Sequence, residues 1–185
     1  MTVLSSETLH ASCVAITGVA VLIEGVSGSG KSDLALRLID RGATLVSDDY
    51  TILRRIEGKL RASAPPNITG LIEVRGVGLV PMPFASDVPV GLIAVITDNI
   101  ERLPDVSTTR IVAGVTVPTC LIAPLGSSAP IKIELLLKLP SFEAIDSCIN
   151  VDSVGTKNSK HTHVQKINPT QVDNSTVRLV VNRNE

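Results

Sequence analysis

The sequence predicts an α/β fold with a P-loop nucleotide-binding core and a mixed sheet. Residues 25–32, GVSGSGKS, fit the phosphate-binding pattern G-x-x-x-x-G-K-[ST]. A β-rich apolar run, residues 19–24, comes directly before this loop, and an amphipathic helical pattern over residues 32–41 follows it. Because a functional loop of this kind needs a strand before it and a helix behind it, the flanks favour a nucleotide site over a chance glycine-rich turn.

The residue types of this loop suit the binding of a phosphate chain. Its glycines let the backbone turn tightly and direct N–H groups at phosphate oxygens. Lys31 adds a positive charge for the β- and γ-phosphates, and the Ser32 hydroxyl can take one coordination position of Mg²⁺. The predicted nucleotide-binding residues are Gly25, Val26, Ser27, Gly28, Ser29, Gly30, Lys31 and Ser32.

The composition limits the classes of protein to consider. The chain has 185 residues, 44% of them hydrophobic, so it can bury a sizeable core. A net charge of −1 and only 2% aromatic residues argue against a nucleic-acid or anionic-membrane surface. The chain has three cysteines, Cys13, Cys120 and Cys148, and no two of them form a C-x-x-C pair. This spacing favours free thiols over a zinc site. No apolar run could span a bilayer and no signal peptide is recognisable, so we expect a cytoplasmic protein.

The segment before the loop is predicted to be a hairpin. Residues 8–16 have a strand pattern, and Thr17-Gly18 makes a tight turn into the strand 19–24. His10 lies early in the first strand. A lone histidine is more often structural than catalytic, but the pairing of the two strands could bring it towards the phosphate-binding loop.

The segment behind the loop ends in two acidic residues. The helix is expected to end at Gly42, and residues 43–47 form a short strand that leads to Asp48 and Asp49. Acidic residues at the carboxyl end of a strand beside a P-loop commonly reach Mg²⁺ or its waters, or act as a base. The alternative is a solvated acidic turn.

A second hairpin and a glycine-containing extended segment come next. Residues 50–55 and 60–62 are predicted strands around a turn, and residues 68–80 are predicted to be extended. In an extended segment Glu73 and Arg75 point the same way. They could form a surface ion pair of little energetic value, or Glu73 could bind Mg²⁺ while Arg75 binds a phosphate.

The remaining elements contain fewer functional signals. Residues 91–98 are predicted as a buried strand, and residues 115–123 as an edge-like strand because Pro118 interrupts them. Residues 131–139 have a helical pattern, with apolar residues four apart at Ile131, Leu135 and Leu139.

Taken together, these segments resemble the catalytic domain of bacterial HPr kinase/phosphorylase, in the short, alphaproteobacterial-like form without the N-terminal domain. The resemblance covers about residues 8–139. It depends on the phosphate-binding loop, on residues 9–12 (LHAS), on Arg41-Gly42 leading to Asp48-Asp49, and on residues 72–78 (IEVRGVG), which look like the family's signature segment. It implies a fold akin to the nucleotide-binding core of phosphoenolpyruvate carboxykinase, and a homo-oligomer, often a hexamer.

The resemblance also implies an activity. The family uses ATP and Mg²⁺ to phosphorylate a serine of HPr or an HPr-like phosphocarrier of the phosphotransferase system. In the full-length family the same site also removes that phosphate with inorganic phosphate, releasing pyrophosphate. The family segment V-P-V-x-x-G-R-N has no clean equivalent here, where residues 117–123 read VPTCLIA. We therefore expect phosphorolysis to be weaker than transfer from ATP.

The resemblance implies catalytic and metal-binding roles for the residues that match the family's motifs. His10 looks like the active-site histidine. The aspartate pair looks like the acid/base, with Asp49 the better match to the assigned position. The catalytic residues that the resemblance implies are His10, Lys31, Asp48, Asp49, Arg75 and Arg102. The Mg²⁺ ligands that it implies are Ser32 and Glu73.

Two other functions also fit a P-loop core. The chain could be a small-molecule kinase, or a nucleotide-sensing regulatory module that binds ATP without transferring phosphate. The product would separate the three functions. Phosphoserine on a carrier protein indicates the protein kinase, phosphate on a metabolite indicates a small-molecule kinase, and neither product indicates a regulatory module. We expect the kinase domain to span residues 1–140 and residues 141–185 to form a polar, poorly ordered tail.

Overall fold

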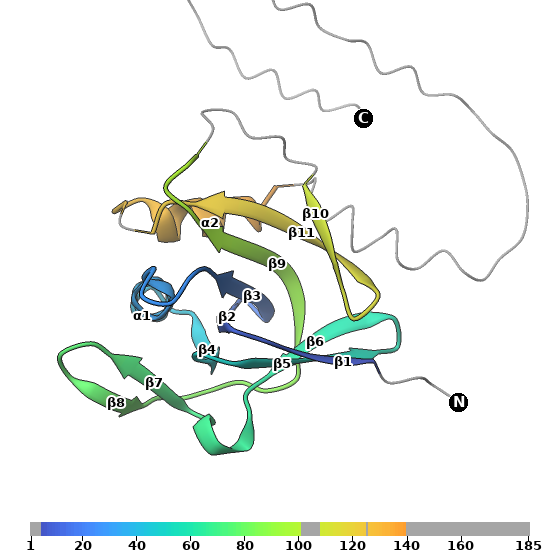
Figure 1. Ribbon diagram of the computed structural model, residues 1–185, viewed down its shortest axis with the longest axis horizontal. Coiled ribbons are helices and arrows are strands. Elements are labelled where there is room, and N and C mark those ends of the chain that lie inside the picture. Colours follow the sequence, from blue (N-terminus) through green and yellow to red (C-terminus); the bar gives the residue numbers. More distant parts are fainter. Residues whose placement is uncertain (1–4, 101–107, 125, 140–185) are drawn as a thin grey trace, which may run out of the picture. The chain divides into compact units, whose positions relative to one another are not determined.

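The computed structural model describes residues 5–100, 108–124 and 126–139, which form strands and a few short helices (Figure 1). The strands are β1 (Ser6–Leu9), β2 (Ala11–Ile16), β3 (Val19–Glu24), β4 (Thr44–Ser47), β5 (Thr51–Ile56), β6 (Lys59–Ser63), β7 (Leu71–Val74), β8 (Gly78–Pro81), β9 (Val88–Ile96), β10 (Thr109–Val112) and β11 (Val115–Ile122). The helices are α1 (Lys31–Asp40), the 3₁₀ turn η1 (Pro66–Ile68) and α2 (Ala129–Leu136).

The main sheet is mixed and is organised around β9. Its central order is β1-β5-β6-β9-β3-β2-β4, and the β10–β11 hairpin joins it through β11. The first residues of β9 pair antiparallel with β6, whereas the later ones lie parallel to β3 on one side and to β11 on the other. This change of partner along one long strand lets the sheet curl, as Figure 1 shows. The predicted α/β fold with a mixed sheet is confirmed.

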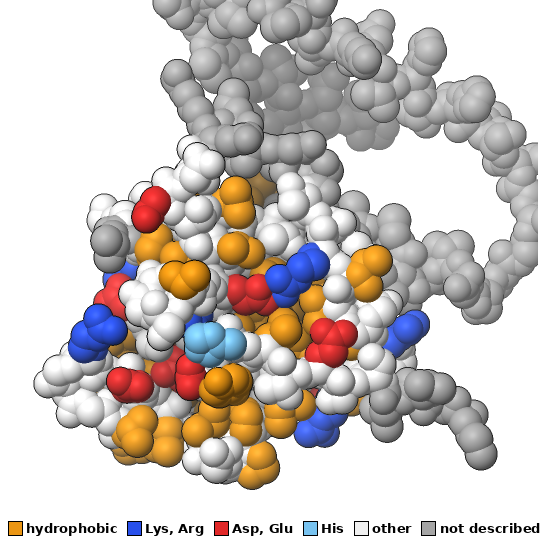
Figure 2. All heavy atoms as spheres, in the orientation of Figure 1, with side chains coloured by type: hydrophobic (Ala, Val, Ile, Leu, Met, Phe, Trp, Pro, Cys, Tyr) orange, Lys and Arg blue, Asp and Glu red, His pale blue; other side chains and the backbone are white. Residues whose placement is uncertain are grey.

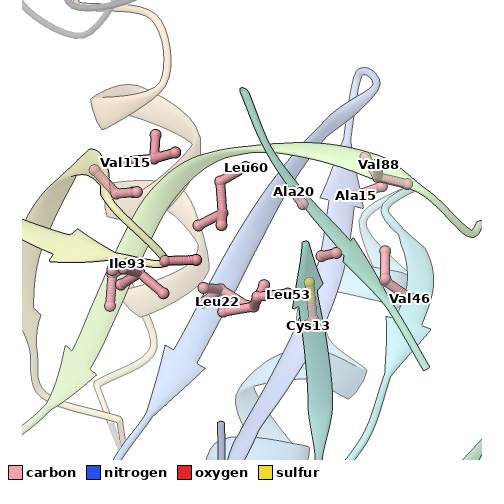
Figure 3. Packing of buried hydrophobic residues seen from close by; sticks show 14 residues of the cluster. Cys13, Ala15, Ala20, Leu22, Val46, Leu53, Leu60, Val88, Ile93 and Val115 are labelled. Atoms are coloured by element: carbon pink, nitrogen blue, oxygen red, sulfur yellow. The ribbon is translucent and has the colours of Figure 1, made fainter. Parts of the chain in front are cut away.

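The alternation of side chains along the strands divides the buried residues into two apolar clusters. Leu22 of β3 belongs to a cluster enclosed by the curled sheet, and Figure 3 shows it meeting Leu53 and Ile93 there. Its neighbours Val21 and Ile23 point to the opposite face and pack with Leu34 and Leu38 of α1. Both faces of β3 are therefore buried, and the end of this strand is held firmly where the phosphate-binding loop begins.

The predicted hairpin before the loop forms, but its first strand is divided. Residues 8–16 break at His10 into β1, which pairs with β5, and β2, which pairs with β3 and β4. The Thr17-Gly18 turn is present, and both residues have positive φ, as a type I′ hairpin turn requires. The division has a clear consequence, because it places His10 at a bend between two parts of the sheet.

The segment 68–80 differs from the prediction of one extended run. It contains the two strands of the β7–β8 hairpin, which turns at residues 75–77. Gly76 and Gly78 have φ of 83° and 116°, a region that glycine adopts without strain, so the glycines allow the turn. Arg75 lies in the turn and Glu73 in the strand, and no ion pair between them is found in the described part of the chain.

The last described elements agree with the sequence in type but not in exposure. Pro118 lies where β11 changes partner from β10 to β9, so β11 is not a simple edge strand. The predicted helix 131–139 is observed as α2, but Ala129, Pro130 and Ile133 are its buried residues. The apolar residues spaced four apart are between 40% and 56% exposed: Ile131, Leu135 and Leu139.

Several sequence predictions fall outside the described residues. They concern Arg102, Cys148 and the polar tail from residue 141 onwards. Within the described ranges, none of the helices is long and apolar enough to cross a membrane.

The two described cysteines are expected to react slowly with alkylating reagents at neutral pH. Cys13 is fully buried, and burial raises its pKa well above the ordinary range; burial also raises the pKa of Cys120 to about 12. Because the thiolate is the reactive form, native protein should be modified at both positions far more slowly than protein unfolded in denaturant. Peptide mapping by mass spectrometry after timed alkylation measures this. Equal rates at Cys13 in the two states would contradict the burial.

Candidate active site

The phosphate-binding loop lies between β3 and α1, where the sequence predicts it. β3 ends at Glu24, and α1 begins at Lys31. Gly30, directly before the helix, has a φ of 96°, and a Cβ there would lie 3.4 Å from Cβ of Pro124. Only glycine suits this position without strain. The first turn of α1 therefore directs its free backbone N–H groups towards the loop, an arrangement that favours anions.

Lys31 lies beneath the loop rather than on the surface. Its Nζ donates to the carbonyl oxygens of Gly25 and Val26 at 3.2 and 3.3 Å, and the residue is only 7% exposed. Two carbonyl partners use two of the three ammonium donors. The positive charge is thus held within the loop that would surround a phosphate chain.

Asp48 connects three elements of the site through its carboxylate. Its Oδ1 accepts from the hydroxyls of Ser12 on β2 (2.7 Å) and Ser32 on α1 (2.9 Å). Its Oδ2 accepts from the backbone N–H of Glu73 on β7 (3.0 Å). Asp48 is buried, with 5% of its surface exposed. We refer to Ser12, Ser32, Asp48 and Glu73 as the Asp48 network.

Asp49 has different surroundings from its neighbour. Its φ is 68°, in the left-handed region, which aspartate tolerates better than most residues. Its side chain is 63% exposed, and Oδ1 lies 2.8 Å from Nε2 of His10. The His10 ring also lies against Tyr50, with 5.3 Å between the ring centroids. The turn after β4 therefore directs one aspartate inward and presents the other to solvent beside a histidine.

These groups surround one cavity of about 860 Å³, which we call the phosphate cavity. Figure 2 shows acidic, basic and histidine side chains gathered on this face of the molecule. The predicted site residues that line it are His10, Val26, Ser27, Gly28, Ser29, Gly30, Lys31, Ser32, Asp49, Glu73 and Arg75. Among the described residues, two predicted site residues are not in its lining: Gly25, at the base of the loop, and Asp48, in the network behind it.

Thr97, Asp98 and Ser12 belong to the site but were not predicted from the sequence. Thr97 and Asp98 follow β9 and line the phosphate cavity, because β9 lies parallel to β3 and the carboxyl ends of both strands meet at the same edge. The available signal was a buried strand that ends in Thr-Asp. Ser12 belongs to the Asp48 network, and its signal was a lone hydroxyl in an otherwise apolar strand.

Ser32 and Glu73 are candidates for binding a metal ion. Both line the phosphate cavity, and both are hydrogen-bonded to the same carboxylate, Ser32 through its hydroxyl and Glu73 through its backbone N–H. The described residues contain no group of three or more His, Cys, Asp or Glu side chains that could hold a metal by themselves. Any ion here would therefore need oxygen ligands from a bound phosphate chain or water, which is usual for Mg²⁺.

Two bidentate ion pairs hold the elements around the loop. Arg110 of β10 donates to both carboxylate oxygens of Glu24, the last residue of β3, and these hydrogen bonds raise the pKa of Arg110. Arg41, at the end of α1, donates to both oxygens of Glu134 on α2 at 2.6 and 2.7 Å, which lowers the pKa of Glu134. Paired planar groups of this kind fix orientation as well as distance. They position the strand before the loop and the helix after it.

Comparison with known proteins shows what the segment around this site is similar to. Residues 2–84 match the family model described as HPr Serine kinase C-terminal domain. An HPr kinase/phosphorylase of Clostridium tetani is 48% identical over 81 residues, which are 43% of this chain and 27% of that protein. One from Clostridium novyi is 44% identical over 81 residues, 43% of this chain and 26% of that protein. Residues 2–84 are therefore similar in sequence to the C-terminal domain of HPr serine kinases.

A solved structure extends the likeness beyond the matched segment. The HPr(Ser) kinase/phosphatase of Coxiella burnetii has a TM-score of 0.65 and 29% sequence identity to this chain, and the match covers 75% of this chain and 98% of that one. The chain spans about a quarter of the length of the curated relatives it matches. The matched residues contain the phosphate-binding loop and the whole Asp48 network, whereas Thr97, Asp98 and Arg102 lie outside them.

Proposed function

We propose that the chain is a Mg²⁺-dependent serine kinase that transfers a phosphoryl group from ATP to HPr or an HPr-like phosphocarrier. One observation supports this most strongly: a single cavity is lined by the phosphate-binding loop, by Asp49 beside His10, and by Glu73 and Arg75. The names of the relatives and of the Coxiella structure support the same substrate. Phosphoryl transfer needs positioning and charge stabilisation more than covalent chemistry, and this lining provides groups for both.

The donor phosphates would bind to the loop and to Lys31. Backbone N–H groups of the loop and of the first turn of α1 would hold the phosphate oxygens, with the positive end of the helix dipole behind them. Lys31 would exchange its contacts to the loop carbonyls for the β- and γ-phosphates. Ser32 and Glu73 fit Mg²⁺, because both present oxygen in the same cavity. When bound, the ion would neutralise negative charge on the phosphates.

Asp49 would act as the base. The carrier serine would lose its proton to the Asp49 carboxylate as its oxygen forms the new bond to the γ-phosphorus, and the bond from that phosphorus to ADP would break. His10 would keep the carboxylate in place through its 2.8 Å contact. Arg75, and Arg102 outside the described residues, would stabilise the charge on the transferred group.

The decisive experiment offers the whole protein an HPr-like carrier with ATP and Mg²⁺. We expect the carrier to gain the mass of one phosphoryl group, and fragmentation to locate it on serine. A carrier in which that serine is replaced by alanine is the control and should gain nothing. A carrier of unchanged mass would refute the proposal. Phosphate on a metabolite would then favour a small-molecule kinase. ATP binding without any phosphorylated product would favour a nucleotide-sensing module.

The same preparation can test the reverse reaction and the organisation of the chain. We propose that phosphorolysis of the phosphoserine carrier by inorganic phosphate is slower than transfer from ATP, because the Gly-Arg-Asn of the family segment is missing from residues 117–123.

The kinase domain would span residues 1–140 of a cytoplasmic homo-oligomer, as in the family's hexamers. Residues 141–185 would contribute little to activity.

A further inference from the structure

Ser12 is a buried hydroxyl in a strand that is otherwise built for the core. It is fully buried in β2, between apolar residues that are also buried: Ala11, Cys13, Val14 and Ala15. A buried hydroxyl costs free energy unless it is hydrogen-bonded, and alanine would fill such a position without that cost. The Ser12 hydroxyl has its partner in Asp48 Oδ1, 2.7 Å away.

Ser12 can affect the phosphate cavity only through its hydrogen bond to Asp48. Side chains alternate along β2, so Ser12 lies on the same face as Val14, which packs with α1. Ser32, on α1, reaches the same Oδ1 from the side of the phosphate cavity. Ser32 lines that cavity and Ser12 does not. Ser12 therefore cannot contact a ligand there, but it shares an acceptor with a residue that can.

The shared acceptor fixes how Ser32 and Glu73 face the phosphate cavity. A serine hydroxyl that donates its proton to Asp48 keeps its lone pairs free for a cation. The terminal torsion of an aspartate is broad, so the Asp48 carboxylate plane depends on its hydrogen bonds. With Ser12 on Oδ1, the carboxylate remains turned so that Oδ2 meets the Glu73 N–H. Without Ser12, the carboxylate could rotate and release both Ser32 and Glu73.

We propose that Ser12 is a positioning residue that orients Asp48, so that Ser32 and Glu73 present their oxygens to one Mg²⁺ in the phosphate cavity. This inference relies on the Mg²⁺–ATP binding contained in the proposed function. It assigns no contact between Ser12 and nucleotide, metal or carrier.

The test measures ATP binding to the whole protein by calorimetry, at Mg²⁺ concentrations from none to saturating. Residues that orient metal ligands typically change metal affinity by roughly 10- to 100-fold when replaced. Ser12→Ala should raise the Mg²⁺ concentration for half-maximal enhancement of ATP binding at least about tenfold. ATP affinity in EDTA should stay the same. Ser12→Thr, which keeps the hydroxyl, should retain most of the Mg²⁺ response.

A matched control and a double variant separate positioning from a general loss of structure. Ser63→Ala also removes a buried serine hydroxyl from a strand, where it accepts from the Asp87 N–H outside the phosphate cavity, and it should not alter the Mg²⁺ response. Because Ser12 acts through Asp48, Ser12→Ala should add little in an Asp48→Ala background.

Three outcomes would overturn the inference. They are an unchanged Mg²⁺ response in Ser12→Ala, an equal loss of ATP affinity with and without Mg²⁺, and full additivity with Asp48→Ala. If the unsubstituted protein shows no Mg²⁺-dependent ATP binding, both this inference and the proposed function are wrong. If it binds Mg²⁺ and ATP but modifies no carrier, only the proposed function is wrong.

Discussion

Replacing Lys31 with alanine is expected to lower phosphoryl transfer by about 1,000-fold or more while the protein stays folded. Lys31 is the one lysine among the described residues that line the phosphate cavity, and its charge is held within the phosphate-binding loop. Removing a charge that stabilises the transferred group raises the barrier directly. The cost in stability should be small, because the contacts that are lost are two long hydrogen bonds of 3.2 and 3.3 Å.

The measurement compares the rate of carrier phosphorylation with the melting temperature of the same variant. Lys132→Ala is the control, since it removes an exposed lysine on α2 that does not line the phosphate cavity. It should leave both quantities unchanged. A folded Lys31→Ala protein with normal turnover would mean that residues 25–32 do not bind the transferred phosphate.

Replacing Asp49 with asparagine is expected to lower turnover at least about 100-fold, the usual contribution of a general base. The amide has nearly the same shape as the carboxylate but cannot take the proton of the carrier serine. The backbone should not change, because asparagine also tolerates the left-handed conformation that Asp49 adopts at a φ of 68°. ATP affinity should therefore be nearly unchanged, and the loss should appear in kcat.

Asp87 provides a closely matched control. It also has a left-handed φ, of 58°, its side chain is exposed, and it forms an ion pair with Arg61 at 3.1 Å outside the phosphate cavity. Asp87→Asn repeats the chemical change without touching the site and should leave kcat unchanged. If Asp49→Asn kept its full kcat, the base would have to be another group of the cavity, and Asp98 would be the next to test.

The parts of the fold that depend on residues close together in the sequence could be predicted from the sequence. The loop 25–32 with its strand and helix, the Thr17-Gly18 turn and the hairpin of β5 and β6 are all observed. In each case the signal is a periodicity or a turn residue within about ten positions. Such local preferences act on the backbone directly, whatever the strand order of the sheet.

The arrangement of the site depended on contacts between distant segments. Asp48 and Asp49 are adjacent and chemically identical, yet one is buried in a network and the other faces the phosphate cavity beside His10. Their difference arises from the turn after β4, which meets β2 on one side and β7 on the other. Residue type alone could not distinguish them, because both fit an acid/base or a metal ligand equally well.

The sequence by itself therefore determined the phosphate-binding loop, the strand and helix on either side of it, and most of the polar residues of the site. The tertiary structure alone decided which strands meet at the carboxyl end of β3, and so added Thr97 and Asp98 to the phosphate cavity and Ser12 to the Asp48 network. It also decided that Ile131 and Leu135 of α2 are exposed. The physical reason is that a repeat in the sequence specifies a face of a helix or strand, whereas burial of that face depends on which distant element packs against it.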